Sequence, residues 1–509
     1  MTNRKRFFYN ATLLTIVTLT IRTVNLAFNA FISREIGAEA LGLYTLIGTV
    51  YAFAVTFATS GINLTVTRLV AAAVGEEREG EISRIMRHAV GYALIFSCFA
   101  AIVLFAFSPF LATAILKDER AVAPLRALSI SLPPIALSAV FSGYFIGVKK
   151  IVRSSGVQVA GQIFKILVTF LFVIKMAKGG VAMATLALCI STTLSELFSF
   201  AFSFLQYIFT KKPTAYDKPT SRFSDISGMA LPLAFSAYIR SSLLTLEHAL
   251  IPRRLKLFGE SNSSALASYG ILHGMALPVT LYPMSLLSSF ASLLVPEFAE
   301  SEARGDSFRI KRICEEVISA TLKYAAPVCV FIWFFAEELA NVIYSSFSAG
   351  QYVAMLAPVI PIMYLDHVTD AMLKGIGEHV YSMWVNISDS LLSVFLIWFL
   401  LPKMGISGYA LVIIIMEGYN FLLSFIRLKQ KIKFSSKCLH SFVLPFVEAC
   451  FSAKLSDEVF DFSGNLTTPR QLISKMLFSV CIFVALNFFH KLFFKKNGYT
   501  YTQKAPIKR

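Results

Sequence analysis

Charged residues are scarce in this sequence of 509 residues. Asp, Glu, Lys and Arg make up 15% of it, whereas 56% of the residues are hydrophobic. No polar stretch is long enough to form a separate soluble domain. This composition excludes an ordinary soluble protein and a disordered chain, because both need far more polar surface.

Motifs that carry enzyme chemistry are also missing. The seven cysteines are scattered, with no CxxC pair and no Cys/His cluster, which argues against a zinc site and a disulfide framework. The sequence has no Walker A loop, no nucleophile elbow and no histidines at metal-binding spacing. We therefore expect no enzyme activity, no cofactor and no metal.

Long apolar runs fill most of the sequence, and each can cross a bilayer core of roughly 30 Å as a helix. They predict an all-α polytopic membrane protein with about 14 transmembrane helices. Whether the thirteenth, which is short and contains Pro445 and Glu448, crosses fully is left open. The predicted spans are 11–32, 43–66, 88–107, 128–148, 157–174, 182–205, 226–250, 268–294, 317–335, 355–376, 384–401, 409–426, 438–453 and 472–490.

The net charge is +17, and the basic residues that produce it are unevenly distributed along the sequence. Lys and Arg gather in alternate connections, starting with Arg4, Lys5 and Arg6, which is the positive-inside pattern. We expect both termini to be cytoplasmic, the basic tail to contact anionic lipid, and no nucleic acid to bind. The first apolar stretch is too long for a signal-peptide core, so we expect no cleavable signal peptide.

An internal repeat covers the first 12 predicted spans. Residues 41–133 align without a gap with 266–358 at an offset of 225, so that Tyr44 matches Tyr269. Upstream the offset is 218, where Arg22 matches Arg240, and downstream it becomes 228. An even number of spans per repeat predicts two parallel six-helix lobes related by an axis along the membrane normal. The predicted domains are an N-terminal lobe (1–210), a cytoplasmic linker (211–225), a C-terminal lobe (226–430) and two extra helices with the basic tail (431–509).

Polar side chains form matching stripes inside the spans of both repeats. Such groups are costly in hydrocarbon unless they face protein or water, so they are the candidate binding residues. Structural roles remain open for several: Arg240 and Glu247 can pair with each other, and His248 reads more readily as a buried, hydrogen-bonded histidine than as a ligand. Asp366 and Asp370 can bind a cation or pair with an arginine. The candidate substrate-binding residues are Arg22, Asn25, Asn29, Gln158, Gln162, Lys165, Arg240 and Glu247.

Guanidinium and ammonium groups in a membrane cavity select anions. Arginine binds phosphate oxygens bidentately and stays charged when desolvated, which suits a diphosphate. Amides such as those of Asn25 and Gln162 suit sugar hydroxyl groups. The stripes therefore predict one wet, cationic cavity for an anionic sugar compound.

Several segments resemble the stage V sporulation protein B-like polysaccharide transporters, of the multidrug/oligosaccharidyl-lipid/polysaccharide exporter superfamily. The likeness covers about residues 7–430 and fades after Arg427. Lys165 departs from the family, where arginine is expected. The matching segments are Arg34-Glu35-Ile36-Gly37, Leu41-Gly42-Leu43-Tyr44, Ser60-Gly61-Ile62, Thr67-Arg68-Leu69, Glu247 to Leu255, Tyr269-Gly270, Leu294 to Glu297, and Leu401-Pro402 with Gly405 to Tyr409.

The resemblance implies two six-helix lobes around a cavity that opens alternately to each side, and a flippase of lipid-linked sugar precursors for peptidoglycan or polysaccharide, in some members for sporulation. The implied location is the bacterial cytoplasmic membrane, with membrane lipids and cell-wall synthesis enzymes as partners. Two rivals stay open: a cation-coupled multidrug antiporter of the same superfamily, and a non-transporting scaffold of a cell-wall assembly complex. The sugar, the energy source and the oligomeric state are left open.

Overall fold

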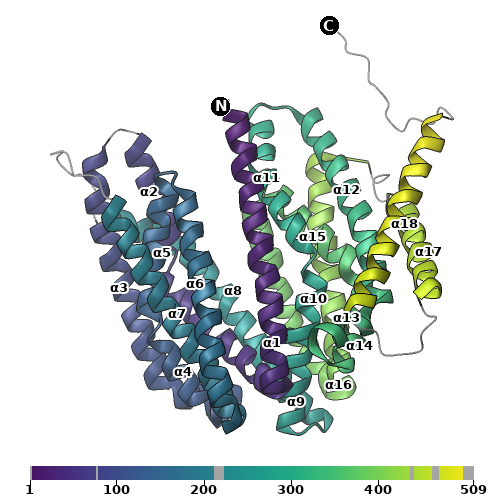
Figure 1. The fold of residues 1–509 in the computed structure, drawn as a ribbon. Helices are drawn as coiled ribbons and strands as arrows, with labels where there is room; N and C mark the ends of the chain where they lie inside the picture. Colours follow the sequence, from purple (N-terminus) through teal and green to yellow (C-terminus); the bar gives the residue numbers. More distant parts are fainter. Residues whose placement is uncertain (1–2, 76–77, 211–222, 436–440, 461–468, 497–509) are drawn as a thin grey trace. The chain divides into compact units, whose positions relative to one another are not determined.

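The computed structural model describes residues 3–75, 78–210, 223–435, 441–460 and 469–496. Within these ranges every regular element is a helix, which confirms the predicted all-α class (Figure 1). Apolar segments of this length become helices because a helix satisfies its backbone hydrogen bonds internally, as a bilayer requires. The predicted linker and basic tail fall mostly outside the described residues.

Nine helices in the described ranges are long and apolar enough to cross a membrane, or ten if the bent pair 119–129 and 132–147 counts as one span. Two of these helical stretches each cover two predicted spans, so together they account for 12 of the 14, and α8 (Phe223–Phe258), at the seventh predicted span, is not among them. Helix α1 (Asn3–Thr59) runs through a kink at Gly37, and α16 (His379–Ile432) runs through a kink at Gly405. Both glycines have positive φ, a conformation that glycine adopts without steric cost. Helix α17 (Val443–Phe460), at the thirteenth predicted span, is not among the nine.

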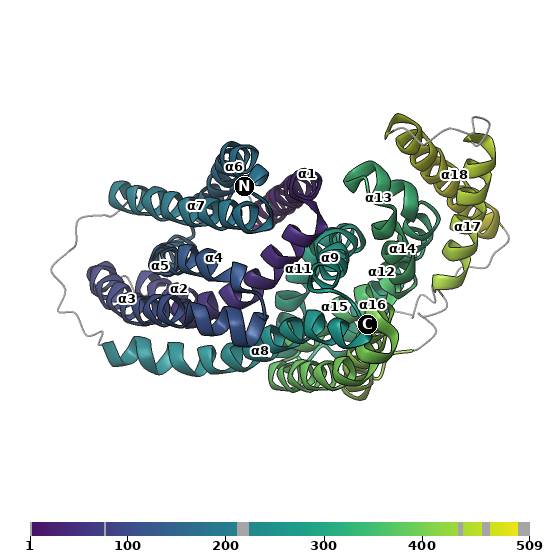
Figure 2. The same ribbon diagram turned by 90° about the horizontal axis from the view of Figure 1, so that it is seen from below.

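The chain divides into two compact units, each described by itself. Unit 1 contains residues 1–275 and 383–416, that is, the first repeat together with the start of the second and part of α16. In unit 1, α6 and α7 lie side by side (Figure 2). Its further elements are α2 (Ile62–Gly75), α3 (Glu79–Phe110), η1 (Leu111–Leu116), η2 (Glu119–Ala121), α4 (Val122–Ser129), α5 (Leu132–Gly147), α6 (Ile151–Met176), η3 (Ala177–Gly179), α7 (Val181–Thr210), α8 (Phe223–Phe258), α9 (Asn262–Gly270) and most of η4 (Ile271–Ala276).

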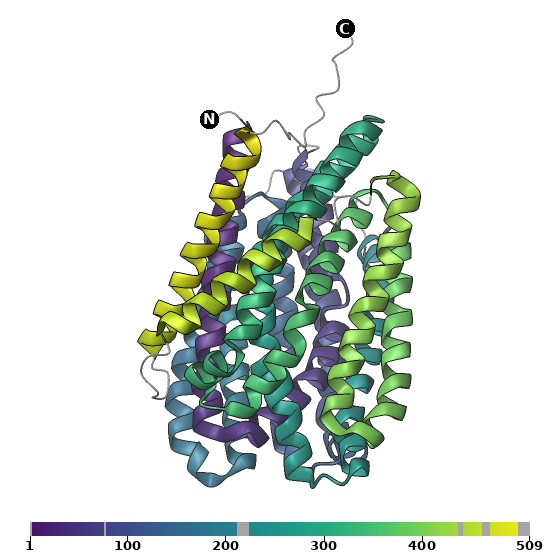
Figure 3. The same ribbon diagram turned by 90° about the vertical axis from the view of Figure 1, so that its right-hand side faces the viewer.

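Unit 2 contains residues 276–382 and 417–509. The yellow helices α17 and α18 pack against each other, and α17 also packs on α12 (Figure 3). The buried residues between them include Phe331, Phe335, Ala449 and Leu472, so the two extra helices share an apolar core with α12. The elements of unit 2 are α10 (Leu277–Leu281), α11 (Met284–Ala303), α12 (Ser307–Phe334), α13 (Ala336–Tyr344), α14 (Phe347–Leu356), η5 (Ala357–Val359), α15 (Ile360–Gly375), the ends of α16, α17 and α18 (Pro469–Lys496).

The sequence repeat is also a repeat of local structure. Lys117 and Ser345 both have a left-handed φ of 56°, and their separation of 228 differs by three residues from the offset of 225 predicted for this stretch. The residue after each, Asp118 or Ser346, then caps the following helix with its side-chain oxygen. The two halves therefore build the same kind of turn.

Large apolar side chains cover the outer faces of several helices. On α3, Phe99 is 58% exposed and Ile102 is 68% exposed, and α18 exposes Phe488 and Phe489 in the same way. A soluble protein rarely presents such continuous apolar surface, whereas a bilayer solvates it. The chain is a multi-pass membrane protein.

Candidate functional site

Two of the predicted polar stripes meet between α1 and α6. Gln162 of α6 donates its side-chain amide to Asn25 of α1, with 2.5 Å between Nε2 and Oδ1. Both side chains are half-buried. Residues 137 positions apart in the chain thus share one polar face.

One turn further along α6, Lys165 extends this polar face. Its ammonium donates to the hydroxyl of Tyr44 at 3.3 Å, and that hydroxyl lies 3.4 Å from the hydroxyl of Thr192 on α7. The Glu196 carboxylate, one turn along α7, lies within electrostatic range of the ammonium. We call Asn25, Gln162, Lys165, Tyr44 and Thr192 the Lys165 cluster.

The two arginines of the stripes have no ionic partner in the part of the chain that the structure describes. Arg22 is half-buried and Arg240 is exposed, and neither forms a hydrogen bond or ion pair with another described residue. Asn29 is half-buried and Gln158 is exposed. Lys165 is therefore held by neighbours, whereas the two guanidinium groups retain their full bonding capacity.

Glu247 is bound on α16 rather than to Arg240. Its carboxylate accepts a hydrogen bond from Ser393 at 2.7 Å, and Asp389 lies within electrostatic range of it. Arg240 and Glu247 are two turns apart on α8, about 10 Å along the axis. The structure thus joins the stripes of the seventh and eleventh predicted spans, as it joins those of the first and fifth.

Beside Glu247, two half-buried histidines and two buried tyrosines form a group of rings that we call the histidine cluster. His248 Nδ1 lies 2.8 Å from the hydroxyl of Tyr269, and His273 Nε2 lies 3.0 Å from the hydroxyl of Tyr409. The two imidazole rings are 4.6 Å apart between centroids. Of these four, the sequence analysis considered only His248 as a polar group in a span. The others stand alone in apolar surroundings, and no stripe marks them.

The acidic pair of the tenth predicted span lies in unit 2. Asp370 forms an ion pair with Lys374 at 2.5 Å, one turn along α15, and Asp366 is half-buried. Asp370 therefore pairs with a lysine of its own helix, a partner that the sequence analysis did not consider.

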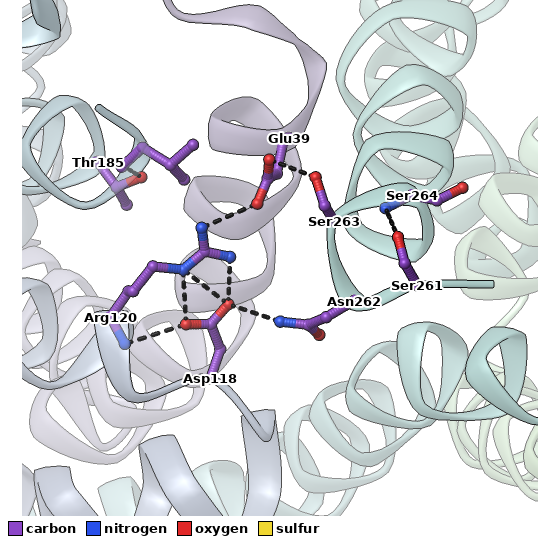
Figure 4. A network of polar contacts seen from close by, with 9 residues as sticks. Glu39, Asp118, Arg120, Thr185, Ser261, Asn262, Ser263 and Ser264 are labelled. Atoms are coloured by element: carbon purple, nitrogen blue, oxygen red, sulfur yellow. Dashed lines mark hydrogen bonds and ion pairs between the residues drawn. The ribbon is translucent and has the colours of Figure 1, made fainter.

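A network of charged and polar groups joins the two repeats within unit 1 (Figure 4). Arg120 binds Asp118 through two nitrogens, at 2.7 and 2.9 Å, and Glu39 at 2.8 Å. Glu39 also accepts from Ser263, and Asn262 lies 3.4 Å from Asp118. Burial disfavours the Asp118 carboxylate, but the hydrogen bonds from Arg120 outweigh this and lower its pKa below the usual value. We call these five residues the Arg120 network.

Next to this network, α1 and α9 cross at glycines. A side-chain carbon on Gly42 would lie 1.9 Å from the carbonyl oxygen of Leu266, and one on Gly270 would lie 2.3 Å from that of Ala38. The backbones are therefore in direct contact, as small residues permit in membrane proteins. Sequence reasoning missed both the crossing and the network, because their members come from separate connections.

Comparison with known proteins places this geometry in a family. Residues 7–302 match the model of the family described as polysaccharide biosynthesis protein, and residues 256–399 match the MatE family. Stage V sporulation protein B of Bacillus subtilis (strain 168) is 24% identical over 420 residues, covering 81% of each chain. Sporulation protein YkvU of the same organism is 21% identical and covers 75% of this chain and 86% of the relative.

Solved structures agree in fold. The lipid II flippase MurJ in an inward closed conformation matches with a TM-score of 0.70 and 16% identity, over 95% of this chain and 99% of the other. An inward-facing multidrug resistance MATE family transporter of the MOP superfamily matches with a TM-score of 0.67 and 16% identity, over 82% and 98%. The first family model covers more than half of the sequence. The chain belongs to the polysaccharide biosynthesis protein family.

Proposed function

We propose that this transporter is a flippase that moves a lipid-linked, polyprenyl diphosphate sugar precursor across the bacterial cytoplasmic membrane. The observation that carries the proposal is the pair of equivalent arginines, Arg22 and Arg240, which lack a protein anion among the described residues. An unpaired guanidinium in a membrane segment is costly, and a diphosphate would supply the missing bidentate acceptor.

The Lys165 cluster suits the rest of such a substrate. Lys165 adds a third positive charge, and the amides of Asn25 and Gln162 can exchange their mutual hydrogen bond for bonds to sugar hydroxyl groups. Arg22 and Asn25 lie three residues apart on α1, on one face of the helix. The polyprenyl chain would stay in the bilayer, since removing it costs about 0.8 kcal/mol per methylene.

Alternating access needs an end that closes and opens, and the Arg120 network offers one. The charge distribution along the sequence favours the outer side for the connections that carry Glu39, Arg120 and Asn262. In this proposal the network and the crossing at Gly42 close the outer end, and both separate when the pathway opens outward.

The names of the similar proteins agree with this substrate class: one is a lipid II flippase and two are sporulation proteins. A role in cell-wall or spore polysaccharide assembly follows for this chain as part of the proposal. Cell-wall synthesis enzymes would then supply and consume the lipid-linked sugar on the two sides.

A second candidate is a cation-coupled multidrug antiporter. The carboxylate of Glu247, with Ser393 and the nearby Asp389, is the observation in its favour, as is the similarity to multidrug transporters. A cationic drug would need these acids and would be repelled by the arginines.

The test is a flipping assay in proteoliposomes with defined lipid-linked sugars and, in parallel, efflux of cationic dyes. We expect flipping of the diphosphate-linked sugar and no dye transport. Dye transport without flipping would favour the antiporter, and neither activity would favour a scaffold. Cysteine labelling of the 211–222 segment in a cysteine-free background should find it cytoplasmic, and labelling from outside intact cells would overturn the assigned orientation.

A further inference from the structure

Arg254 lies one turn before the end of α8, outside the clusters described above. It is almost completely buried, with 8% of its surface exposed. Its guanidinium carbon lies 3.0 Å from the centre of the Trp398 ring, so the planar group stacks on the indole of α16. Trp398 itself is 51% exposed, and both residues belong to unit 1. An arginine and a tryptophan from separate helices thus form one stacked pair.

The guanidinium of Arg254 has five N–H donors and no acceptor for them in the described part of the chain. Its Nε is completely buried without a hydrogen bond. The charged group within electrostatic range of it is Arg253, a second cation, rather than an acid. Stacking on an indole offsets only part of the cost of removing a guanidinium from water. An anion from outside the protein would supply the acceptor that the described residues do not.

The charge distribution along the sequence places the stacked pair at the outer boundary of the membrane. The seventh predicted span ends at residue 250 and the eleventh at residue 401, and both run from the cytoplasmic to the outer side. Tryptophan is enriched at this boundary, at the level of the lipid headgroups. The anions that this depth supplies are the phosphate groups of lipids.

The surface next to the stacked pair is apolar, which favours a lipid over a water-soluble anion. Leu257 on α8 and Phe395 on α16 are each more than half exposed. Leu257 lies three residues from Arg254, and Phe395 lies three residues from Trp398, so each is a neighbour of the pair on its helix. Acyl chains can cover these side chains while a headgroup reaches the guanidinium.

We propose that Arg254 and Trp398 form a binding site for the phosphate of an anionic phospholipid in the outer leaflet. The guanidinium holds the phosphate through its terminal nitrogens, and the indole fixes the plane of the guanidinium. The site is separate from the one proposed for the transported diphosphate, because Arg240 lies about 21 Å away along α8. Phe258, one turn from Arg254, packs against α16 at Gly405, so the lipid lies beside the kink of α16.

Trp398 itself can report the bound lipid. The sequence has three tryptophans, so Trp333→Phe together with Trp384→Phe leaves Trp398 alone. The full-length protein with these changes is reconstituted in phosphatidylcholine vesicles that contain increasing shares of brominated phosphatidylcholine or brominated phosphatidylglycerol, whose acyl chains quench tryptophan fluorescence on contact. We expect phosphatidylglycerol to bind about tenfold more strongly, the lower end of what hydrogen bonds to a charged group contribute. Equal quenching by the two lipids would overturn the proposal.

Variants separate the stacked pair from the overall positive charge of the protein. Arg254→Gln should abolish the lipid preference, and Arg254→Lys, which keeps the charge without the planar group, should retain part of it. Arg126→Gln is the matched control and should keep the preference, because Arg126 lies 5.3 Å from the Phe105 ring but already donates to Ser108. A protein that keeps only Trp333, half exposed at the end of α12, should show no preference. An equal preference in every variant would mean that net charge alone attracts the lipid, against the proposal.

Competition distinguishes the phospholipid from two other sources of phosphate. Unbrominated phosphatidylglycerol should restore the fluorescence of Trp398, whereas inorganic phosphate and a polyprenyl diphosphate sugar, the latter at equal mole fraction, should not. Stronger restoration by the diphosphate sugar would make the pair part of the substrate pathway, and restoration by inorganic phosphate would make it a site for a water-soluble anion. Either result contradicts the phospholipid site. The quenching needs no transport, so a failure of the proposed flippase activity leaves this test intact.

Discussion

Tyr44 and Tyr269 occupy equivalent positions in the two repeats, and each sets its hydroxyl against a basic side chain. Tyr44 is 3.3 Å from the ammonium of Lys165, and Tyr269 is 2.8 Å from Nδ1 of His248. Both repeats thus place a tyrosine hydroxyl beside a basic side chain, but the type of basic side chain differs. A lysine carries a charge that is almost permanent, whereas a histidine carries one that depends on pH.

The cations of the stripes should be essential for transport of an anion. Arg22→Ala and Arg240→Ala each remove charge-assisted hydrogen bonds worth about 1.5–3 kcal/mol, so flipping should fall about 10- to 100-fold. Asp366→Asn should have a milder effect. Arg312→Ala, whose side chain is 70% exposed and pairs with Glu316 on the surface, is the control and should leave flipping unchanged. If the acid substitution is the one that stops transport, the antiporter replaces the flippase.

Arg240 should contribute to transport without contributing to stability. Breaking a buried ion pair on one side costs about 3–5 kcal/mol, but Arg240 is exposed and has no partner among the described residues. Arg240→Gln should therefore leave the melting temperature unchanged, and Glu247→Gln should lower it because a neutral amide oxygen is a weaker acceptor for Ser393 than a carboxylate. Thermal melts of both variants and of the double variant test this. Recovery of stability in the double variant would mean that the two residues pair.

The crossing of α1 and α9 should tolerate no added carbon. Gly42→Ala would place a side-chain carbon 1.9 Å from the carbonyl oxygen of Leu266, so the two helices must move apart. We expect this to lower the free energy of unfolding by about 1–3 kcal/mol. Gly48→Ala on the same helix is a matched control, because nothing lies within 4 Å of the added carbon. Melting temperatures should fall for the first and stay level for the second. Equal melts would argue that the helices are not in backbone contact in the membrane.

The Arg120 network should keep the proposed outer end of the transport pathway closed at any pH from about 5 to 8. The pKa of Asp118 lies below its usual 3.8, so the ion pair is complete above that value and is lost only as the pH falls through the lowered pKa. Leu266→Cys, buried at the crossing, should therefore react slowly with an external thiol reagent at pH 8 and at pH 5. Adding Arg120→Ala should speed the reaction of Leu266→Cys at both pH values. Faster labelling at pH 5 in the unaltered network would point to a pH-dependent closure.

The sequence predicted the helical class, the repeat and the meeting of polar stripes, since all three depend on periodic patterns. Asn25 and Gln162 are an example, because each lies on a recognisable polar face. The Arg120 network could not be predicted in this way: Glu39, Arg120 and Ser263 come from three different connections, and only the packing of α1 on α9 brings them together. The contact between His273 and Tyr409 could not be predicted for a related reason. A single polar residue in an apolar span forms no pattern until its partner from another helix is known.

Helix α1 carries both Asn25, in the Lys165 cluster, and Gly42, in the crossing with α9, and Gly37 lies between them. Gly37 therefore lies on α1 between the proposed substrate contact and the proposed outer closure, so a change of backbone angle at Gly37 would move one relative to the other. A residue with a side chain at this φ of 78° would be strained. In the proposed function, a sugar bound near Asn25 would therefore act on the closure at Gly42 through α1 alone.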